Sequence, residues 1–277
     1  MNEETRKTVL AMTLMSDILF NAFMNENKEC MAYILSVIMD RNDLNINRLE
    51  TQYTIPNPFS RGVRFDVFAT DDYGHEYDVE VQQVDSGASP KRARYNSSMM
   101  DYRALDKGQD WEKLPATCVI FITENDVLGG DKPIYHIERC IRELENKSFG
   151  DKTQIIYVNG AYKAKDGEEK NALISLIEDF HCVNADDMNS ALLANRMKQI
   201  KSSEKEMGDM CKEVEKYAEK YAEKYAEKKA SQAKTEGKIE GKIEEIKRLI
   251  NAGITTLAII KESGLYTPEE LDAISAP

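Results

Sequence analysis

The pattern that most constrains the fold of this chain is a strand, turn and strand in residues 64–83, RFDVFATDDYGHEYDVEVQQ. From Val63, just before this stretch, apolar side chains recur at every second position, at Val63, Phe65, Val67 and Ala69. This period predicts a strand whose opposite face carries Asp66. The second part alternates in the same way and places Glu80 and Gln82 together, opposite Val79 and Val81. We therefore expect two neighbouring strands with polar side chains gathered on one face.

The residues between these strands are typical of a tight turn, because Asp71 to Gly74 combine aspartates with a glycine. A three-residue loop at 72–74, with Gly74 left-handed, predicts an antiparallel hairpin. That register pairs residue 71 with 75, and therefore Asp66 with Glu80. Two carboxylates paired in this way, with Cβ atoms roughly 5 Å apart, destabilise a sheet unless a cation lies between them. A hard divalent ion such as Mg²⁺ suits such oxygen ligands.

A simpler interpretation of the same residues is a solvated acidic strand face. The hairpin carries further acids throughout its length, at Asp71, Asp72, Glu76 and Asp78. Acidic side chains are usually exposed. The spacing alone therefore leaves both interpretations open.

The same region is similar to the PD-(D/E)xK nuclease superfamily and, within it, to the recombination-promoting nucleases, which are also described as transposases. The similarity lies in the aspartate near the end of one strand, the glycine turn, and E-x-Q in place of the commoner E-x-K. It continues through PKRARYNSSMMDYRALDKGQDWEKLPATCVIFI, with its R-x-R-Y element and W-x-x-L-P bend. It also includes SDILFNAFM near the N-terminus, where Asn21 replaces a usual lysine.

This resemblance implies a metal-dependent endonuclease that hydrolyses DNA phosphodiester bonds in recombination or transposition. It assigns Asp66, Glu80 and the backbone carbonyl of Val81 as ligands of Mg²⁺, with Mn²⁺ as a substitute. Gln82 joins Asp66 and Glu80 as the third catalytic residue, in place of the superfamily's lysine. A lysine can stabilise negative charge, whereas a glutamine can only orient water through hydrogen bonds. The replacement is compatible with slow hydrolysis.

A basic helix is expected after the second strand. Ser89 is a good N-cap, Pro90 fits the first helical position, and the helix extends to about Lys107. Three of its side chains are candidates for binding the substrate phosphate, namely Arg92, Arg94 and Tyr95. The alternative is a solvated helix with a buried tyrosine.

Asp17 in the first helix is a candidate additional acid of the site. It could instead be the N-cap of the apolar run that follows it. The sequence favours neither role.

The N-terminal part alternates helices and strands. Apolar periodicity predicts helices near 14–40, 136–146 and 168–180, and strands near 46–54, 117–123 and 153–158. This order predicts the α/β class, with a mixed central sheet flanked by helices and an α-helical C-terminal extension. The resemblance to the nuclease superfamily implies that the sheet is restriction-endonuclease-like.

Composition narrows the possible classes of protein. The five cysteines form no C-x-x-C pair, so neither a zinc site nor a disulfide framework is predicted. No run of about 18 apolar residues and no secretory segment is present, so we expect no membrane partner and a cytoplasmic location. The net charge of −12 argues against broad nonspecific binding to DNA, and local basic patches would have to make the contacts.

The character of the sequence changes near Leu192. The period-four run KYAEKYAEKYAEKK favours a helix, but its tyrosines advance by about 40° per repeat and form no heptad seam. The last segment predicts an amphipathic helix, a short second helix, and a third that begins with the capping box TPEE. These helices resemble a helix-turn-helix loosely. The acidic last helix favours self-association, or packing against the catalytic domain, over the reading of bases.

We therefore expect a nuclease-like domain at 1–190, a charged helical spacer at 191–235 and a small helical element at 236–277. Two functions are compatible with the sequence. The first is a Mg²⁺-dependent DNA endonuclease that forms a homo-oligomer through its C-terminal helices. The second is a catalytically weak or inactive nuclease fold that acts as an oligomeric binding or assembly module.

Overall fold

The computed structural model describes residues 2–165 and 167–276, except for the side chains at 232, 233, 235 and 236. The chain divides into two compact units, Met1–Val214 and Glu215–Pro277. Each unit is described separately.

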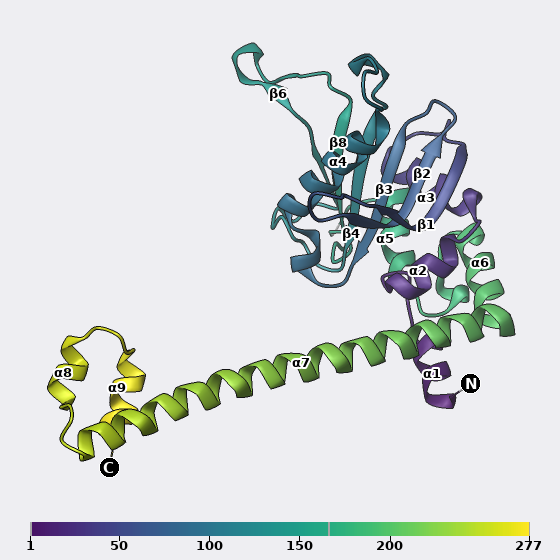
Figure 1. Ribbon diagram of the computed structural model, residues 1–277. Helices are drawn as coiled ribbons and strands as arrows, with labels where there is room; N and C mark the ends of the chain where they lie inside the picture. The colour runs from purple at the N-terminus through teal and green to yellow at the C-terminus, as the bar shows by residue number, and fades with distance from the viewer. Residues whose placement is uncertain (1, 166, 277) are drawn as a thin grey trace. The chain divides into compact units, whose positions relative to one another are not determined.

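A mixed sheet forms the centre of the first unit (Figure 1). Within the described residues it has six strands in the order β1-β2-β3-β4-β8-β5. Strand β2 is antiparallel to both of its neighbours, β1 and β3. Strands β3, β4 and β8 are parallel, and β5 is antiparallel to β8. The strands span β1 (Ile46–Ile55), β2 (Val63–Asp71), β3 (Glu76–Gln82), β4 (Thr117–Thr123), β5 (Ile134–Ile137) and β8 (Thr153–Asn159). The mixed sheet confirms the predicted α/β class.

Helices cover both faces of this sheet. One apolar cluster joins one face to α2 (Asp17–Met24), α3 (Lys28–Ile38), α5 (Ala172–His181) and α6 (Ala191–Ser202). A second cluster joins the other face to α4 (Pro90–Ala104). The first unit also contains α1 (Glu3–Leu10).

The side chains of β2 do not alternate between a buried and a polar face as expected, because helices cover both faces of the sheet. Val67 and Ala69 lie in the first cluster, but Phe65 lies in the second, so the prediction that all of them share one face is wrong. The alternation breaks at Asp66, where the ladder to β3 ends and where the neighbouring strand contains Gln52 with a left-handed φ of 54°. At this point the Asp66 carboxylate accepts from the Val81 N–H of β3.

The turn between β2 and β3 matches its prediction. The Asp71 N–H donates to the His75 carbonyl at 3.0 Å, and Gly74 has a φ of 80°. The ladder pairs Val67 with Val79 and Thr70 with Glu76, which is the predicted register.

Three helix predictions need correction. The expected helix at 14–40 is two helices, because the chain breaks at Asn25–Asn27. The helix expected at 168–180 begins only at Ala172, with Asn171 as its N-cap. The helix expected at 136–146 is wrong. Its first residues pair with the free edge of β8 as β5, and the rest forms a small ribbon of β6 (Cys140–Ile141) and β7 (Lys147–Ser148).

The core of the first unit extends beyond residue 190. Helix α6 and the start of α7 (Glu204–Asn251) contribute buried side chains to the first cluster, namely Leu193, Met197, Ile200, Met207, Met210 and Cys211. The expected domain boundaries stay predictions, and this compact unit ends at Val214.

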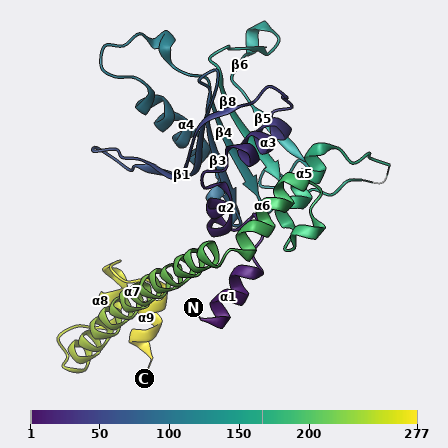
Figure 2. The same cartoon turned by 90° about the vertical axis from the view of Figure 1, so that its right-hand side faces the viewer.

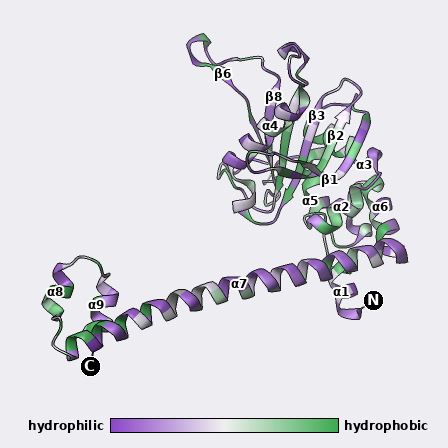
Figure 3. Ribbon diagram, viewed as in Figure 1, coloured by the Kyte–Doolittle hydropathy of each residue, from purple (hydrophilic) through white to green (hydrophobic). Residues whose placement is uncertain are grey.

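The second unit contains the rest of α7, α8 (Leu257–Glu262) and α9 (Pro268–Ser275). The KYAE repeats lie within α7 and are hydrophilic, whereas its last turns carry apolar side chains (Figure 3). Thr267 and Glu270 form the predicted capping box at the start of α9. In the described part of the chain, none of the helices has the length and apolar character needed to span a membrane.

Candidate active site

Asp66 and Glu80 meet where β2 and β3 begin to separate. The last ladder pair is Val67 with Val79, so the next residues along the two strands are Asp66 and Glu80. The Val81 N–H donates to Asp66 Oδ2 at 3.3 Å, which holds the Asp66 carboxylate against the backbone of β3. Glu80 has an exposed fraction of 0%.

The electrostatics of this pair are unfavourable without a cation. Burial, followed by the charge of Asp17, raises the pKa of Asp66 to about 6. Burial, followed by the charge of Asp66, raises the pKa of Glu80 to about 8. Each carboxylate therefore costs free energy when both are charged, because a buried charge loses water and faces a like charge.

Helix α4 brings a cation to Glu80. Ser89 Oγ accepts from the Arg92 N–H at 3.3 Å, and this capped first turn places the Arg92 guanidinium over β3. There Arg92 forms an ion pair with Glu80 and donates to the Gly87 carbonyl at 2.7 Å. Arg92 lowers the pKa of Glu80, but less than burial and Asp66 raise it.

Gln82 lies on the same side of β3 as Glu80. Its Nε2 donates to Glu80 Oε2 at 3.1 Å. A Cβ atom at position 87 would lie 2.0 Å from Gln82 Oε1, so Gly87 leaves space for the amide. Gln82 is thus placed to orient Glu80.

The sequence reasoning missed two buried residues of this site, Asp78 and Asn96. Asn96 Nδ2 donates to Asp78 Oδ2 at 2.8 Å and lies 3.4 Å from Glu80 Oε1. Asp78 has an exposed fraction of 0%, and its Oδ1 has no hydrogen-bond partner among the described residues. Burial and the charge of Glu80 raise the pKa of Asp78 well above its usual value.

A signal for both residues was present in the sequence. Asp78 has the same strand phase as Glu80, and Asn96 follows Arg92 by one helical turn. The burial of Asp71, Asp78 and Glu80 contradicts the interpretation of the hairpin as a solvated acidic face.

Asp17 is the first residue of α2, and Ser16 holds the N-cap position, so the N-cap role considered for Asp17 is wrong. Asp17 is close enough to raise the pKa of Asp66. One turn further along α2, the side-chain oxygen of Asn21 is buried and has no hydrogen-bond partner among the described residues.

The remaining substrate-binding candidates differ in their surroundings. Arg94 is exposed, and it forms no ion pair with any described residue. Tyr95 is half-buried, and its hydroxyl donates to the Arg61 carbonyl and lies 3.4 Å from Ser60 Oγ. Tyr95 therefore contacts the loop between β1 and β2.

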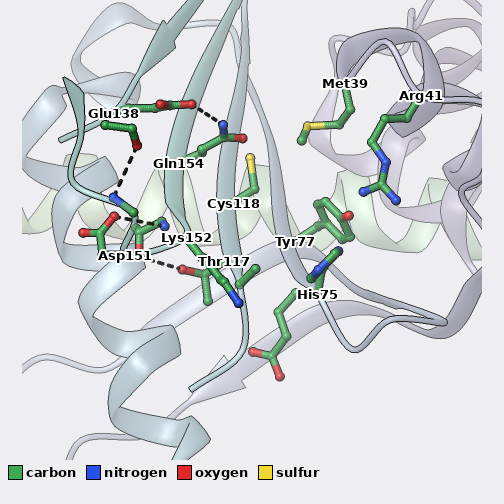
Figure 4. A pocket seen from close by; sticks show the side chains of 15 residues that line it. Met39, Arg41, His75, Tyr77, Thr117, Cys118, Glu138, Asp151, Lys152 and Gln154 are labelled. Atoms are coloured by element: carbon green, nitrogen blue, oxygen red, sulfur yellow. Dashed lines mark hydrogen bonds between the residues drawn. The ribbon is translucent and has the colours of Figure 1, made fainter. Parts of the chain in front are cut away.

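A cavity of about 290 Å³ lies elsewhere on the sheet, at the amino ends of β3, β4 and β8 (Figure 4). Its lining includes Arg41, His75, Tyr77, Cys118 and Lys152. None of the predicted site residues lines it.

The donors at Asp66 and Glu80 suit a hard divalent cation. Carboxylate and backbone oxygens are preferred ligands of such ions, and a divalent cation would relieve the cost of two neighbouring like charges, of which Glu80 is buried and Asp66 half-buried. No group of three or more His, Cys, Asp or Glu side chains with the geometry of a metal site occurs among the residues that the structure describes. A site of two carboxylates and one backbone carbonyl has fewer such side chains than that.

Comparison with known proteins agrees with this geometry. A family model described as PD-(D/E)XK nuclease family transposase matches residues 16–238, which include all the site residues described above. Searches of curated proteins and of solved structures found no significant match. Because the family model matches well over half of the 277 residues, the chain belongs to the PD-(D/E)XK nuclease family of transposases.

Proposed function

We propose that this protein is a metal-dependent endonuclease that hydrolyses phosphodiester bonds in DNA, with Mg²⁺ as the ion and Mn²⁺ as a substitute. Membership of the nuclease family supports a hydrolase acting on nucleic acid. The observation that carries the proposal is the half-buried Asp66 beside the buried Glu80. The pKa of each carboxyl stays raised although Arg92 pairs with Glu80, so their two charges are costly unless a further cation accompanies them.

Asp66, Glu80 and the carbonyl of Val81 would hold the ion. When bound, the ion would polarise the phosphate and lower the pKa of a water molecule. Asp66 is oriented by the Val81 N–H, and Glu80 by Gln82 and Asn96. Asp17 is the candidate additional acid, since it is close enough to affect the charge of Asp66.

Arg92, Arg94 and Tyr95 are the proposed substrate contacts. Arg92 is partly exposed beside Glu80, so its guanidinium can face both the carboxylate and a phosphate oxygen. Gln82 cannot supply the positive charge of the superfamily's lysine. Arg92, which pairs with Glu80, carries a positive charge that could substitute for it.

Cleavage of supercoiled plasmid by the full-length chain tests this proposal. We expect nicked or linear DNA with Mg²⁺ or Mn²⁺, no cleavage with a chelator, and at least a hundredfold loss of rate for Asp66→Asn and Glu80→Gln. Asp72→Asn, which removes an exposed carboxylate from the same hairpin, should retain the wild-type rate.

The second candidate function is that of a nuclease fold that binds or assembles without cleaving. The glutamine at position 82 and the net charge of −12 favour it. Folded wild-type protein that neither cleaves plasmid nor gains thermal stability with Mg²⁺ would support this function and contradict the first. Homo-oligomerisation through the C-terminal helices is compatible with both functions, and sedimentation of the full-length chain tests it.

A further inference from the structure

The loop between β1 and β2 carries an exposed aromatic ring close to two arginines in the sequence. We define the tip as residues 56–64, PNPFSRGVR. Phe59 has an exposed fraction of 93%, higher than that of any other exposed large apolar side chain in the described part of the chain. Figure 2 shows the end of the β1–β2 hairpin, which carries the tip, extending on the same side of the sheet as α4. Such exposure of a large ring costs free energy in water, and a ring held in this way is available to a partner.

Specific contacts hold the tip in place. Asn57 Oδ1 accepts from the Phe59 N–H at 3.0 Å, and Asn57 Nδ2 lies 3.8 Å from the sulfur of Met99 in α4. The Tyr95 hydroxyl donates to the Arg61 carbonyl. A Cβ atom at Gly62 would lie 2.8 Å from the Ile55 carbonyl oxygen, so this close approach of the two strands requires glycine. The ring is therefore presented by an anchored turn.

The tip lies beside the candidate active site. Arg64 precedes Asp66 by two residues, and it is close enough for its charge to lower the pKa of Asp66. Tyr95, which holds the tip, follows Arg92 by three residues, or about 4.5 Å along the helix axis. Arg92 in turn contacts Glu80.

The surroundings of the tip are cationic, although the chain as a whole has a net charge of −12. The tip contains Arg61 and Arg64 and no acidic residue, and residues 90–95 of α4 contain three basic residues and no acidic one. Arg61, Arg64 and Arg94 are exposed, and no ion pair joins any of them to another described residue. Unpaired arginines around an aromatic ring are suited to nucleic acid, since phosphates take the charges and every base offers a face for stacking.

We propose that the tip binds DNA next to the scissile phosphate, with Phe59 stacked on an unpaired or unstacked base and Arg61 and Arg64 bound to neighbouring phosphates. The preferred substrate is therefore DNA with unpaired bases beside the cleaved bond. This inference rests on the proposed function and adds to it the class of DNA structure that is cleaved. In a continuous duplex, Phe59 could stack only after unstacking a base step, which costs free energy.

Fluorescence anisotropy with the full-length chain carrying Asp66→Asn tests the proposal without cleavage. The two probes are a short duplex and the same duplex with an internal unpaired segment containing 2-aminopurine. We expect tighter binding to the second probe. Phe59→Ala should weaken that binding about tenfold and abolish the quenching of 2-aminopurine, while Phe59→Trp should retain both.

Two further variants separate stacking from charge. Arg61→Gln should weaken binding to both probes equally. It should also reduce the slope of log K against log salt concentration by about one, as expected for the loss of one phosphate contact. Tyr73→Ala removes an exposed aromatic ring at the opposite end of β2 and should change neither probe's affinity.

Equal affinity of Phe59→Ala and its parent for both probes would overturn the proposal while leaving the nuclease function intact, provided that wild-type protein still cleaves plasmid. Reduced self-association of Phe59→Ala, with unchanged binding to DNA, would assign the tip to a protein partner and would also overturn it. Failure of the parent to bind either probe, together with no plasmid cleavage by the wild type, would overturn both proposals.

Discussion

At the scale of single residues, the candidate site is a set of buried acids that destabilises the metal-free protein. Glu80 has no exposed surface, and its pKa is raised from 4.5 to about 8 by burial and by Asp66. A carboxyl with a raised pKa binds more protons in the folded state than in the unfolded state. The contribution of the protonated Glu80 to the free energy of unfolding is therefore complete below about pH 4.5 and is lost as the pH rises toward 8.

Asp66→Asn should accordingly stabilise the metal-free protein at alkaline pH. The variant removes one of two like charges, and an asparagine oxygen can still accept from the Val81 N–H. We expect the free energy of unfolding at pH 8.5, with a chelator, to rise by about 1–2 kcal/mol relative to wild type. Saturating Mg²⁺ should reverse the order, because only wild type retains both carboxylate ligands. Urea denaturation measures both differences, and the same order under both conditions would contradict the metal site.

Asn96 gives a second prediction at this scale. Its amide is buried and bridges Asp78 and Glu80, so Asn96→Ala leaves Asp78 with neither oxygen paired to a described residue. We expect a loss of roughly 1–3 kcal/mol in the free energy of unfolding. Ser98→Ala on the exposed face of α4 is the matched control and should change it by less than about 0.5 kcal/mol. Similar effects of the two variants would show that the bridge is unimportant for stability.

At the scale of elements, α4 supplies a positive charge to the site. Its capped first turn places Arg92 on Glu80, and the Arg92 guanidinium lowers the pKa of that carboxyl. Arg92→Gln removes this charge, so the pKa of Glu80 rises further and a higher pH is needed to ionise it. We expect the rise in cleavage rate with pH to shift by about one unit toward alkaline pH at low Mg²⁺, and by less at saturating Mg²⁺. The control is Lys107→Gln, just beyond the end of α4, which should leave the dependence of cleavage rate on pH unchanged. A shift of this dependence toward acid pH in Arg92→Gln would contradict the effect proposed for Arg92 on Glu80.

The elements also show what sequence patterns could predict. The register of β2 and β3 was predictable because the turn at 72–74 has few alternatives. The strands at 117–123 and 153–159 were predictable because they contain the continuous apolar runs CVIFI and IIYV. Residues 136–146 were mispredicted because Ile137, Cys140, Ile141 and Leu144 have helical spacing. In the structure this segment is largely exposed, so a helix here would gain little from burying its apolar side chains. The edge of β8 instead provides backbone hydrogen-bond partners for Ile134–Ile137. The roles of Asp78 and Asn96 depend on α4 lying over β3, which no local pattern specifies.

At the scale of the whole molecule, the two compact units differ in how many apolar side chains they bury. The first contains the sheet and both apolar clusters, whereas the second buries few apolar side chains, among them Ile246 and Ile274. No disulfide bond joins the cysteines that the structure describes, so none stabilises either unit. We therefore expect the first unit to hold nearly all of the stability of the chain.

Truncation tests where the nuclease unit ends. A chain of residues 1–214 keeps the side chains of α6 and of the first turns of α7 that pack in the first cluster, while a chain of residues 1–190 loses them. Removing buried residues such as Leu193, Met197 and Met207 costs about 2–5 kcal/mol each when only the side chain is shortened. We therefore expect the 1–190 chain to fail to fold. The 1–214 chain should unfold cooperatively within a few degrees of the full-length protein and gain a similar stabilisation from Mg²⁺.

Calorimetry of both chains makes the comparison, and circular dichroism shows which of them is folded. A folded 1–190 chain with a native melting temperature would mean that α6 and α7 are dispensable for the core. A 1–214 chain that melts far below the full-length protein would mean that residues 215–277 stabilise the nuclease unit.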